Sequence, residues 1–181
     1  MNIFPKQRIV ITGPESSGKT WLSEALSKHY NTIWTPEYAR SYLDEINRPY
    51  EEADLLIIAQ KQLELQNKDL KKAPNLLFCD TGLLVLKIWS AFKYGRTHPW
   101  INQELSADHY DLFLLCTPDL PWQYDPLREH PEERDILFKV YEDTLKALQL
   151  PYEIISGKGE TRLHNAIKIV DTFLENNKPG P

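Results

Sequence analysis

The fold is decided by GPESSGKT, the stretch Gly13-Pro14-Glu15-Ser16-Ser17-Gly18-Lys19-Thr20. It matches the pattern G-x-x-x-x-G-K-[ST] of a phosphate-binding loop. The apolar run Arg8–Thr12 (RIVIT) before it predicts a buried strand, and Lys19–Tyr30 after it has the periodicity of a helix. The motif therefore stands in the strand–loop–helix context that it requires.

The residue types of this loop suit a nucleoside triphosphate. Glycines let successive backbone N–H groups turn inward around an anion, and the helix N-terminus adds positive potential. In such a loop, Lys19 reaches the β- and γ-phosphates and the Thr20 hydroxyl binds Mg²⁺. The alternative is a glycine-rich turn that only caps a helix. Motif and context together indicate that Gly13–Thr20 form a site for ATP and Mg²⁺.

Strand-length apolar runs and helical stretches alternate along the rest of the chain, as in βαβ units. Further strands are expected at Thr32–Thr35, Asn75–Asp80, Asp111–Cys116 and Tyr152–Ser156. Further helices are expected at Glu51–Lys72, Thr81–Phe92, Glu132–Leu148 and Glu160–Glu175. The sequence thus predicts an α/β, three-layer P-loop kinase fold. Its five-stranded, mainly parallel sheet has helices on both faces. We expect one domain over residues 1–175 and a flexible tail over 176–181.

Composition excludes several classes of protein. The chain of 181 residues is 41% hydrophobic and 26% charged, which is typical of a globular domain. A net charge of −5 disfavours a nucleic-acid partner. No apolar run approaches the roughly 18 residues of a membrane span, and no secretory signal is visible. The two cysteines, Cys79 and Cys116, lie in apolar runs and are expected to be reduced thiols in a cytoplasmic protein.

Asp80 ends the apolar run NLLFC, so a buried strand would deliver its carboxylate to the edge of the sheet where the phosphate loop lies. Asp80 then either binds magnesium or takes a proton from the acceptor, and the sequence leaves both roles open. The alternative is an N-cap of the next helix, since Thr81 and Gly82 follow.

The segment Pro36–Arg40 (PEYAR) follows the second expected strand, where a loop faces the ligand crevice. The carboxylate of Glu37, the ring of Tyr38 and the guanidinium of Arg40 together suit a polar, ring-bearing acceptor. A simple helix start is the alternative, and it explains the proline and the glutamate.

A proline-rich, charged segment over 117–134 follows the fourth expected strand, in the place of the mobile lid of small P-loop kinases. Its arginines, Arg128 and Arg134, suit phosphate contacts upon closure, the alternative being ordinary surface ion pairs. Trp122 and Tyr124, in this polar stretch, are candidates to clamp an aromatic acceptor. Trp89 lies in an apolar helix and is expected to belong to the core.

The turn SGKGETR (156–162) follows the fifth expected strand. We expect it to lie against the adenine base of ATP, with Arg162 stacked on that base. The alternative is a plain strand-to-helix turn capped by Thr161 or Glu160.

Several of these stretches together resemble the ribosylnicotinamide kinase domain of NadR-type proteins over roughly residues 8–173. They are GPESSGKT, PEYAR, FCDT, PWQYDPLR and SGKGETRL. The resemblance implies transfer of the ATP γ-phosphoryl group to the 5′-hydroxyl of nicotinamide riboside. It places Glu37 and Arg40 at the riboside, Asp80 as the active-site carboxylate, and Trp122, Asp125 and Arg128 in the acceptor and lid region. NadR-type proteins usually carry a nucleotidyltransferase domain whose H-x-G-H signature is absent here. The expectation is therefore a stand-alone kinase, or one half of a system whose other half is elsewhere.

The interpretation is therefore an ATP- and Mg²⁺-dependent kinase of nicotinamide riboside, a small-molecule enzyme with no nucleic-acid or membrane partner. Lys19, Asp80, Glu37 and Arg128 are the expected catalytic residues, with Asp80 favoured over Glu37 as the base. Two alternatives remain: a kinase of another nucleoside or small alcohol, and a regulatory ATPase that turns over without an acceptor.

Overall fold

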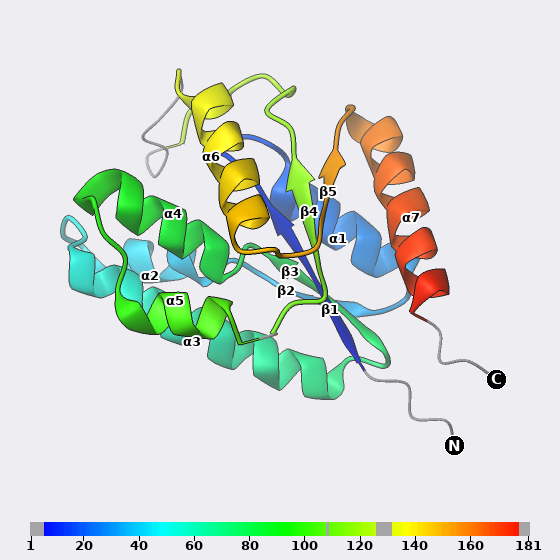
Figure 1. Ribbon diagram of the computed structural model, residues 1–181, viewed down its shortest axis with the longest axis horizontal. Coiled ribbons are helices and arrows are strands. Elements are labelled where there is room, and N and C mark those ends of the chain that lie inside the picture. Colours follow the sequence, from blue (N-terminus) through cyan, green and yellow to red (C-terminus); the bar gives the residue numbers. More distant parts are fainter. Residues whose placement is uncertain (1–5, 108, 126–131, 178–181) are drawn as a thin grey trace.

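The computed structural model describes residues 6–107, 109–125 and 132–177, and a parallel five-stranded sheet runs through its centre (Figure 1). The order of the strands is β2-β3-β1-β4-β5. Their bounds are β1 Gln7–Thr12, β2 Ile33–Thr35, β3 Leu76–Asp80, β4 Leu112–Cys116 and β5 Tyr152–Ile155. The strand before the phosphate loop is thus the central one.

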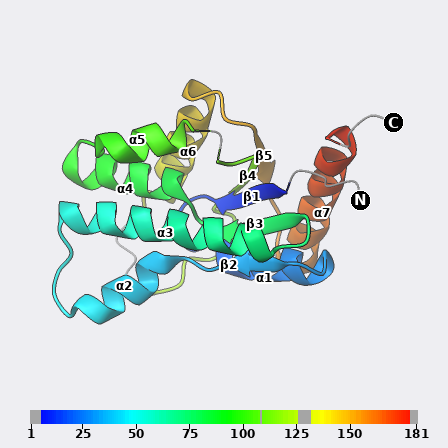
Figure 2. The same cartoon turned by 90° about the horizontal axis from the view of Figure 1, so that it is seen from below.

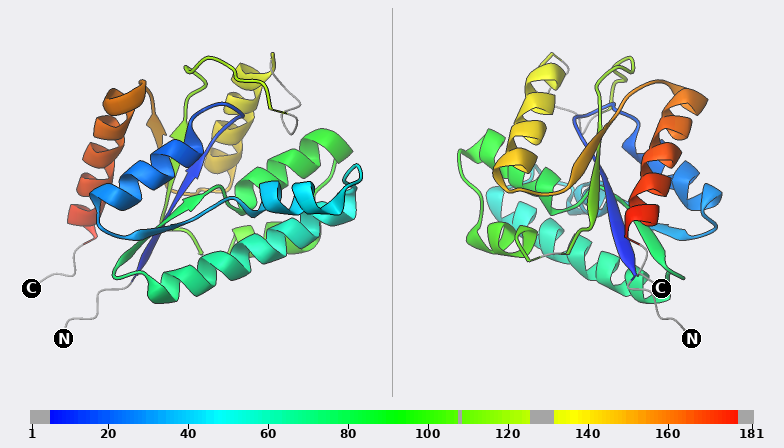
Figure 3. Two further views of the ribbon diagram at one scale, coloured as in Figure 1. Left: turned by 180° about the vertical axis from the view of Figure 1, so that it is seen from behind. Right: turned by 45° about the vertical axis from the view of Figure 1, so that its right-hand side comes forward.

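Side chains alternate between the two faces of the three middle strands. In β1, Ile9 and Ile11 belong to one apolar cluster and Val10 to the other, and β3 and β4 alternate in the same way. Helices α1 (Lys19–His29) and α7 (Gly159–Asn176) cover the first face (Figures 2 and 3). The opposite face packs against α3 (Glu52–Lys72), α4 (Leu83–Tyr94) and α6 (Arg134–Ala147). The predicted three-layer P-loop kinase fold is confirmed.

Two helices were not expected from the sequence. Helix α2 spans Tyr38–Ile46, with Glu37 at its N-cap position, so the helix-start interpretation of PEYAR is correct for the backbone. Helix α5 spans Pro99–Leu105, and the His98 ring accepts a hydrogen bond from the Trp100 N–H at its start. Both are short, and short helices give too few turns for periodicity to reveal them.

The expected segment boundaries can be compared only where residues are described. Helix α7 ends at Asn176, and residues 178–181 of the expected tail lie outside the described part of the chain. The same holds for residues 126–131 of the expected lid. No helix within the described ranges is both long and apolar enough to cross a membrane.

The corner between α2 and α3 is fixed by one buried carboxylate. Asp54 accepts hydrogen bonds from the Arg48 guanidinium at 2.7 and 2.8 Å, and from the Tyr42 hydroxyl and the Glu51 N–H, each at 2.7 Å. Glu51 and Asp54 form a capping box at the start of α3. Arg48 contributes most to holding the pKa of Asp54 well below its usual range. This corner fixes the end of α2, whose first turn carries the acceptor residues predicted from PEYAR.

We predict that Asp54→Asn lowers the free energy of unfolding at pH 7 by about 1–2 kcal/mol, as for the loss of a helix cap. Because the pKa is lower in the folded state, the ionised carboxylate stabilises the protein fully above its unfolded pKa of about 4. That contribution is lost as the pH falls toward the folded pKa. Urea unfolding at several pH values should therefore show the difference between wild type and variant narrowing below about pH 4.

The control is Asp44→Asn, which changes an exposed carboxylate of α2 and should leave stability unaltered. A difference between wild type and Asp54→Asn that is the same at pH 3 and pH 7 would contradict the role assigned to the ionised carboxylate.

Candidate active site

The phosphate loop joins β1 to α1 at the carboxyl edge of the sheet (Figure 1). Gly13 and Gly18 adopt φ angles of 134° and 75°, a region that L side chains rarely enter. A Cβ atom at Gly13 would lie 2.7 Å from the Cys116 carbonyl oxygen, so β4 passes too close for any side chain there. Both glycines of the motif are thus required by the backbone path.

Lys19 and Ser17 are bonded to the loop's own carbonyl groups. The Lys19 ammonium donates to the Gly13 oxygen at 3.0 Å and to the Pro14 oxygen at 2.8 Å. The Ser17 hydroxyl also donates to the Pro14 oxygen, at 2.8 Å. A hydrogen bond between two charged groups is stronger than one to a neutral carbonyl, so an anion at the loop competes for this ammonium.

Asp80 meets the phosphate loop across the sheet. It pairs with Ile11 in the β1–β3 register, and its Oδ2 accepts a hydrogen bond from the Thr20 hydroxyl at 2.5 Å. Its Oδ1 is buried and has no hydrogen-bond partner among the described residues. Helix α4 has no side-chain cap, so the N-cap alternative for Asp80 is wrong. Burial raises the pKa of Asp80, and the Thr20 hydrogen bond and Lys19 oppose the rise.

A pocket of about 470 Å³ opens from the phosphate loop. Its lining includes residues 13–21, here called the nucleotide end, and Glu37, Arg40 and apolar side chains of α4, here called the acceptor end. Helix α6 closes one wall with Leu137 and Tyr141. The volume is within the range of small-molecule sites. One cavity therefore joins the predicted ATP loop to two of the predicted acceptor residues.

Glu37 lies half-buried at the acceptor end of this pocket. Desolvation and the negative charge of Asp80 raise its pKa, while Lys19 and Arg40 oppose that rise. A carboxylate with a raised pKa is a better proton acceptor near neutral pH. Of the two proposed bases, Glu37 faces the pocket directly, whereas Asp80 approaches it through Thr20. Glu37 therefore lines the pocket itself, whereas Asp80, the base favoured from the sequence, does not.

The segment after β4 reaches over the pocket at two points. Asp125 pairs with the Arg40 guanidinium at 2.9 Å, and the Gln123 N–H donates to the Ser16 hydroxyl at 3.1 Å. Arg134 begins α6 and donates to the Leu120 carbonyl at 2.8 Å, so it holds the root of this segment. The predicted catalytic Arg128 lies outside the described residues.

The aromatic residues predicted from sequence are not those that line the pocket. Tyr124 is 81% exposed and packs edge-to-face on Trp122, and neither lines the pocket. Tyr38 turns away to pack beside Tyr42. Trp89, assigned to the core from sequence, does line the pocket, and so does Phe92. Trp89 is held there by a hydrogen bond from its indole N–H to the Tyr50 hydroxyl at 2.8 Å.

Arg162 is buried beneath the phosphate loop. Its side chain is 1% exposed and donates to the carbonyls of Ser17, Thr117 and Gly157. It also forms an ion pair with Asp119. The prediction that Arg162 stacks on adenine is wrong in this structure, because its guanidinium is enclosed by protein. Its contacts join the loop, the end of β4 and the turn after β5, and Arg162 lies 145 residues from its partner Ser17 in sequence.

Comparison with known proteins identifies the family. The model of a family described as "AAA domain" matches residues 8–162. The trifunctional NAD biosynthesis/regulator protein NadR of Escherichia coli is 30% identical over 131 residues, which are 69% of this chain and 32% of that protein. NadR of Salmonella typhimurium is 29% identical over the same shares. The chain thus spans about a third of the length of these curated relatives.

Solved structures agree on the fold. A NadR protein in complex with NR superposes with a TM-score of 0.80 at 22% identity, over 93% of this chain and 51% of that one. Thymidylate kinase from Ehrlichia chaffeensis gives a TM-score of 0.61 at 18% identity, over 92% of this chain and 99% of that one. At these identities the likeness establishes the P-loop kinase fold alone. Together, the family match and the NadR alignment show that this chain belongs to the AAA-domain family of P-loop proteins and is homologous to part of NadR.

Proposed function

We propose that this protein is a kinase that transfers the γ-phosphoryl group of ATP to the 5′-hydroxyl of nicotinamide riboside, giving nicotinamide mononucleotide. The observation that carries the proposal is the continuous pocket of about 470 Å³ between the phosphate loop and the Glu37–Arg40 turn. A motor or switch needs only the nucleotide end of such a pocket. The second end, with a carboxylate, a guanidinium and aromatic walls, suits a polar ring-bearing acceptor. The NadR homology and a NadR structure described as a complex with NR support this choice of acceptor.

At the nucleotide end, Lys19 leaves the carbonyl groups of Gly13 and Pro14 for the β- and γ-phosphates. Thr20 and Asp80 form a pair of hard oxygen ligands that fits Mg²⁺, and the unpartnered Oδ1 of Asp80 gives that pair a vacant acceptor. The ion, when bound, supplies neutralisation of phosphate charge. The loop's inward N–H groups spread the remaining charge over the backbone.

At the acceptor end, Glu37 accepts a hydrogen bond from the 5′-hydroxyl and thereby orients the hydroxyl oxygen along the line of transfer. The new P–O bond forms to that oxygen as the bond to the β-phosphate oxygen breaks, and ADP leaves. The hydroxyl proton passes to Glu37 and then to solvent. Because the transition state of phosphoryl transfer is loose, positioning and charge neutralisation supply most of the catalysis. Arg40, held by Asp125 at 2.9 Å, is in place to contact the ribose or the transferred group.

The direct test is a panel of acceptors. ATP consumption is measured with nicotinamide riboside, with the common nucleosides and with no acceptor. The proposal expects turnover that depends on nicotinamide riboside and a product of the mass of the mononucleotide. Turnover with another nucleoside alone would replace the acceptor and keep the kinase. Turnover that is equal with and without acceptors would indicate a regulatory ATPase instead.

Lys19→Ala should lower kcat by at least about 100-fold, the scale of a lost charge-stabilising group in an active site. The fold should persist, because Lys19 bonds only to carbonyls of the loop in the described structure. Turnover and circular dichroism are measured on one preparation.

The matched control for this change is Lys28→Ala, which removes an exposed lysine of the same helix paired with Glu24. Its activity should equal that of the wild type. A folded Lys19→Ala protein with near-normal turnover would overturn the assignment of the ATP site.

Glu37→Gln should lower kcat by at least tenfold and change the pH profile. In the wild type, activity should fall as the pH drops through the pKa of Glu37, which burial and Asp80 raise above its usual value. A protonated carboxyl cannot accept the hydroxyl proton, so this loss is on the acid side. The glutamine variant should lack that acid limb. If the acid limb persists unchanged in Glu37→Gln, another group is the base.

Trp89→Leu should raise the KM for nicotinamide riboside by roughly two- to thirty-fold, the value of one lost contact between a cation and an aromatic face at about 0.5–2 kcal/mol. The KM for ATP should barely change. Trp34→Leu is the control, since Trp34 packs half-buried against the opposite face of the sheet. Equal effects of the two variants on the riboside KM would show that Trp89 does not contact the acceptor.

A further inference from the structure

The turn that follows Asp80 has an unusual backbone. Thr81 adopts a φ angle of 66°, although it is β-branched and such residues rarely enter this region. It is fully buried, and its hydroxyl makes no hydrogen bond with any described residue. Strain of this kind persists only where the surroundings fix the conformation. The contacts around Thr81 therefore determine how the chain leaves β3, and with it the direction of the preceding carboxylate.

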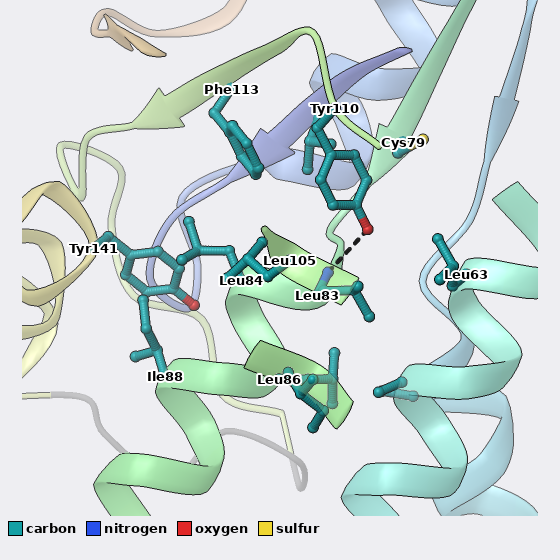
Figure 4. Close-up of a cluster of buried hydrophobic side chains, with 14 of the residues drawn as sticks. Leu63, Cys79, Leu83, Leu84, Leu86, Ile88, Leu105, Tyr110, Phe113 and Tyr141 are labelled. Atoms are coloured by element: carbon teal, nitrogen blue, oxygen red, sulfur yellow. Dashed lines mark hydrogen bonds between the residues drawn. The ribbon is translucent and has the colours of Figure 1, made fainter. Parts of the chain in front are cut away.

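Two buried polar side chains hold this turn. The Gln66 carboxamide of α3 donates to the Thr81 carbonyl at 3.0 Å and accepts from the Tyr110 hydroxyl at 3.1 Å. The same hydroxyl accepts from the Leu83 N–H, at 3.2 Å, as α4 begins (Figure 4). On the sheet side, the Thr81 N–H donates to the Ile11 carbonyl at 3.0 Å. The turn is thus bonded on both sides of its strained residue.

The side chains of this network are buried, hydrogen-bonded and closely packed. Gln66 is 0% exposed and Tyr110 is 6% exposed, so a lost partner leaves a buried polar group unpaired. Gly82 passes directly under the phenol, where a Cβ atom would lie 3.2 Å from the Tyr110 oxygen. The Tyr110 ring itself packs edge-to-face on Phe113, with ring centres 5.3 Å apart. Removing the hydroxyl alone would therefore leave this ring contact in place.

We propose that Tyr110 and Gln66 are positioning residues that hold the Thr81 turn and thereby aim the Asp80 carboxylate at Thr20. Neither residue lines the pocket, and their contacts reach the site through the turn that follows Asp80. The two residues maintain the contact between Asp80 Oδ2 and the Thr20 hydroxyl. They also maintain the orientation of Oδ1, which has no partner among the described residues. The catalytic consequence rests on the proposed kinase function, in which this pair of oxygens holds the magnesium of ATP.

The first experiment is Tyr110→Phe with kinetics. We expect kcat to fall about tenfold and the Mg²⁺ concentration for half-maximal activity to rise about three- to tenfold. The KM of the acceptor should remain within twofold, since neither Tyr110 nor Gln66 lines the pocket. Tyr30→Phe is the matched control, because its hydroxyl bonds to Asp171 at 2.7 Å on the far helix α7. That variant should lose stability and keep both kinetic values.

The second experiment needs no turnover. Binding of a non-hydrolysable ATP analogue is measured by calorimetry over a range of Mg²⁺ concentrations. Tyr110→Phe should need about three- to tenfold more Mg²⁺ to reach the affinity of the wild type, and the two should bind equally without the ion. Gln66→Glu provides an independent variant if Tyr110→Phe does not fold. It keeps an acceptor for Tyr110 but loses the donor to Thr81, so it should show the same shift.

The outcomes separate the two proposals. If the wild type phosphorylates no acceptor, the proposed function fails, and the calorimetric shift still decides the role of Tyr110 and Gln66. A Tyr110→Phe protein that matches Tyr30→Phe in both Mg²⁺ dependences, with only its thermal stability lowered, would overturn the positioning role. Equal loss of analogue affinity with and without Mg²⁺ would also overturn it, because the effect would then not pass through Asp80.

Discussion

The buried guanidinium of Arg162 is the interaction on which the site depends. A charged group that is 1% exposed is stable only when its N–H groups are paired, and here the pairings reach three parts of the edge of the sheet. Ser17 belongs to the phosphate loop, Thr117 and Asp119 to the exit of β4, and Gly157 to the turn after β5. Asp119 completes the set by accepting from the Gly157 N–H at 2.7 Å. Three loops are thus held in one arrangement by a single side chain.

The charged side chains around the pocket suit the binding of a polyanion. Burial raises the pKa of both Glu37 and Asp80, and the charge of Asp80 raises the pKa of Glu37 further. Lys19 and Arg40 oppose both rises. Lys19 rests on neutral carbonyls, which a phosphate group can displace at little cost. Arg40 is already paired with Asp125, so the acceptor turn and the segment after β4 are linked at the rim of the pocket. The pocket therefore offers a cationic end beside two carboxylates, which suits joining a phosphate donor to a hydroxyl acceptor.

The walls of the pocket explain how one cavity serves two substrates. The phosphate loop and Thr20 follow the central strand, and at position 13 the approach of β4 leaves room only for glycine. Helices α4 and α6 supply the apolar walls, and Ile88 and Tyr141 of these helices belong to the buried cluster drawn in Figure 4. Helix α4 starts directly after the Asp80 turn, so the carboxylate and the aromatic wall come from neighbouring stretches of the chain.

Much of this was determined by the sequence. The motif Gly13–Thr20 fixes the loop, because its glycines and lysine have chemical reasons to be where they are. Apolar strands predict a sheet covered on both faces, and the run ending in Asp80 places a carboxylate at its edge. The tertiary structure decided the rest. Helix α4 is apolar nearly all round, so no pattern could separate the pocket-lining Trp89 from core positions. Arg162 finds its partners across up to 145 residues, and the strain at Thr81 is held by side chains from two other elements. Local sequence carries periodicity and motif, whereas such long-range pairings exist only once the strands have been brought side by side.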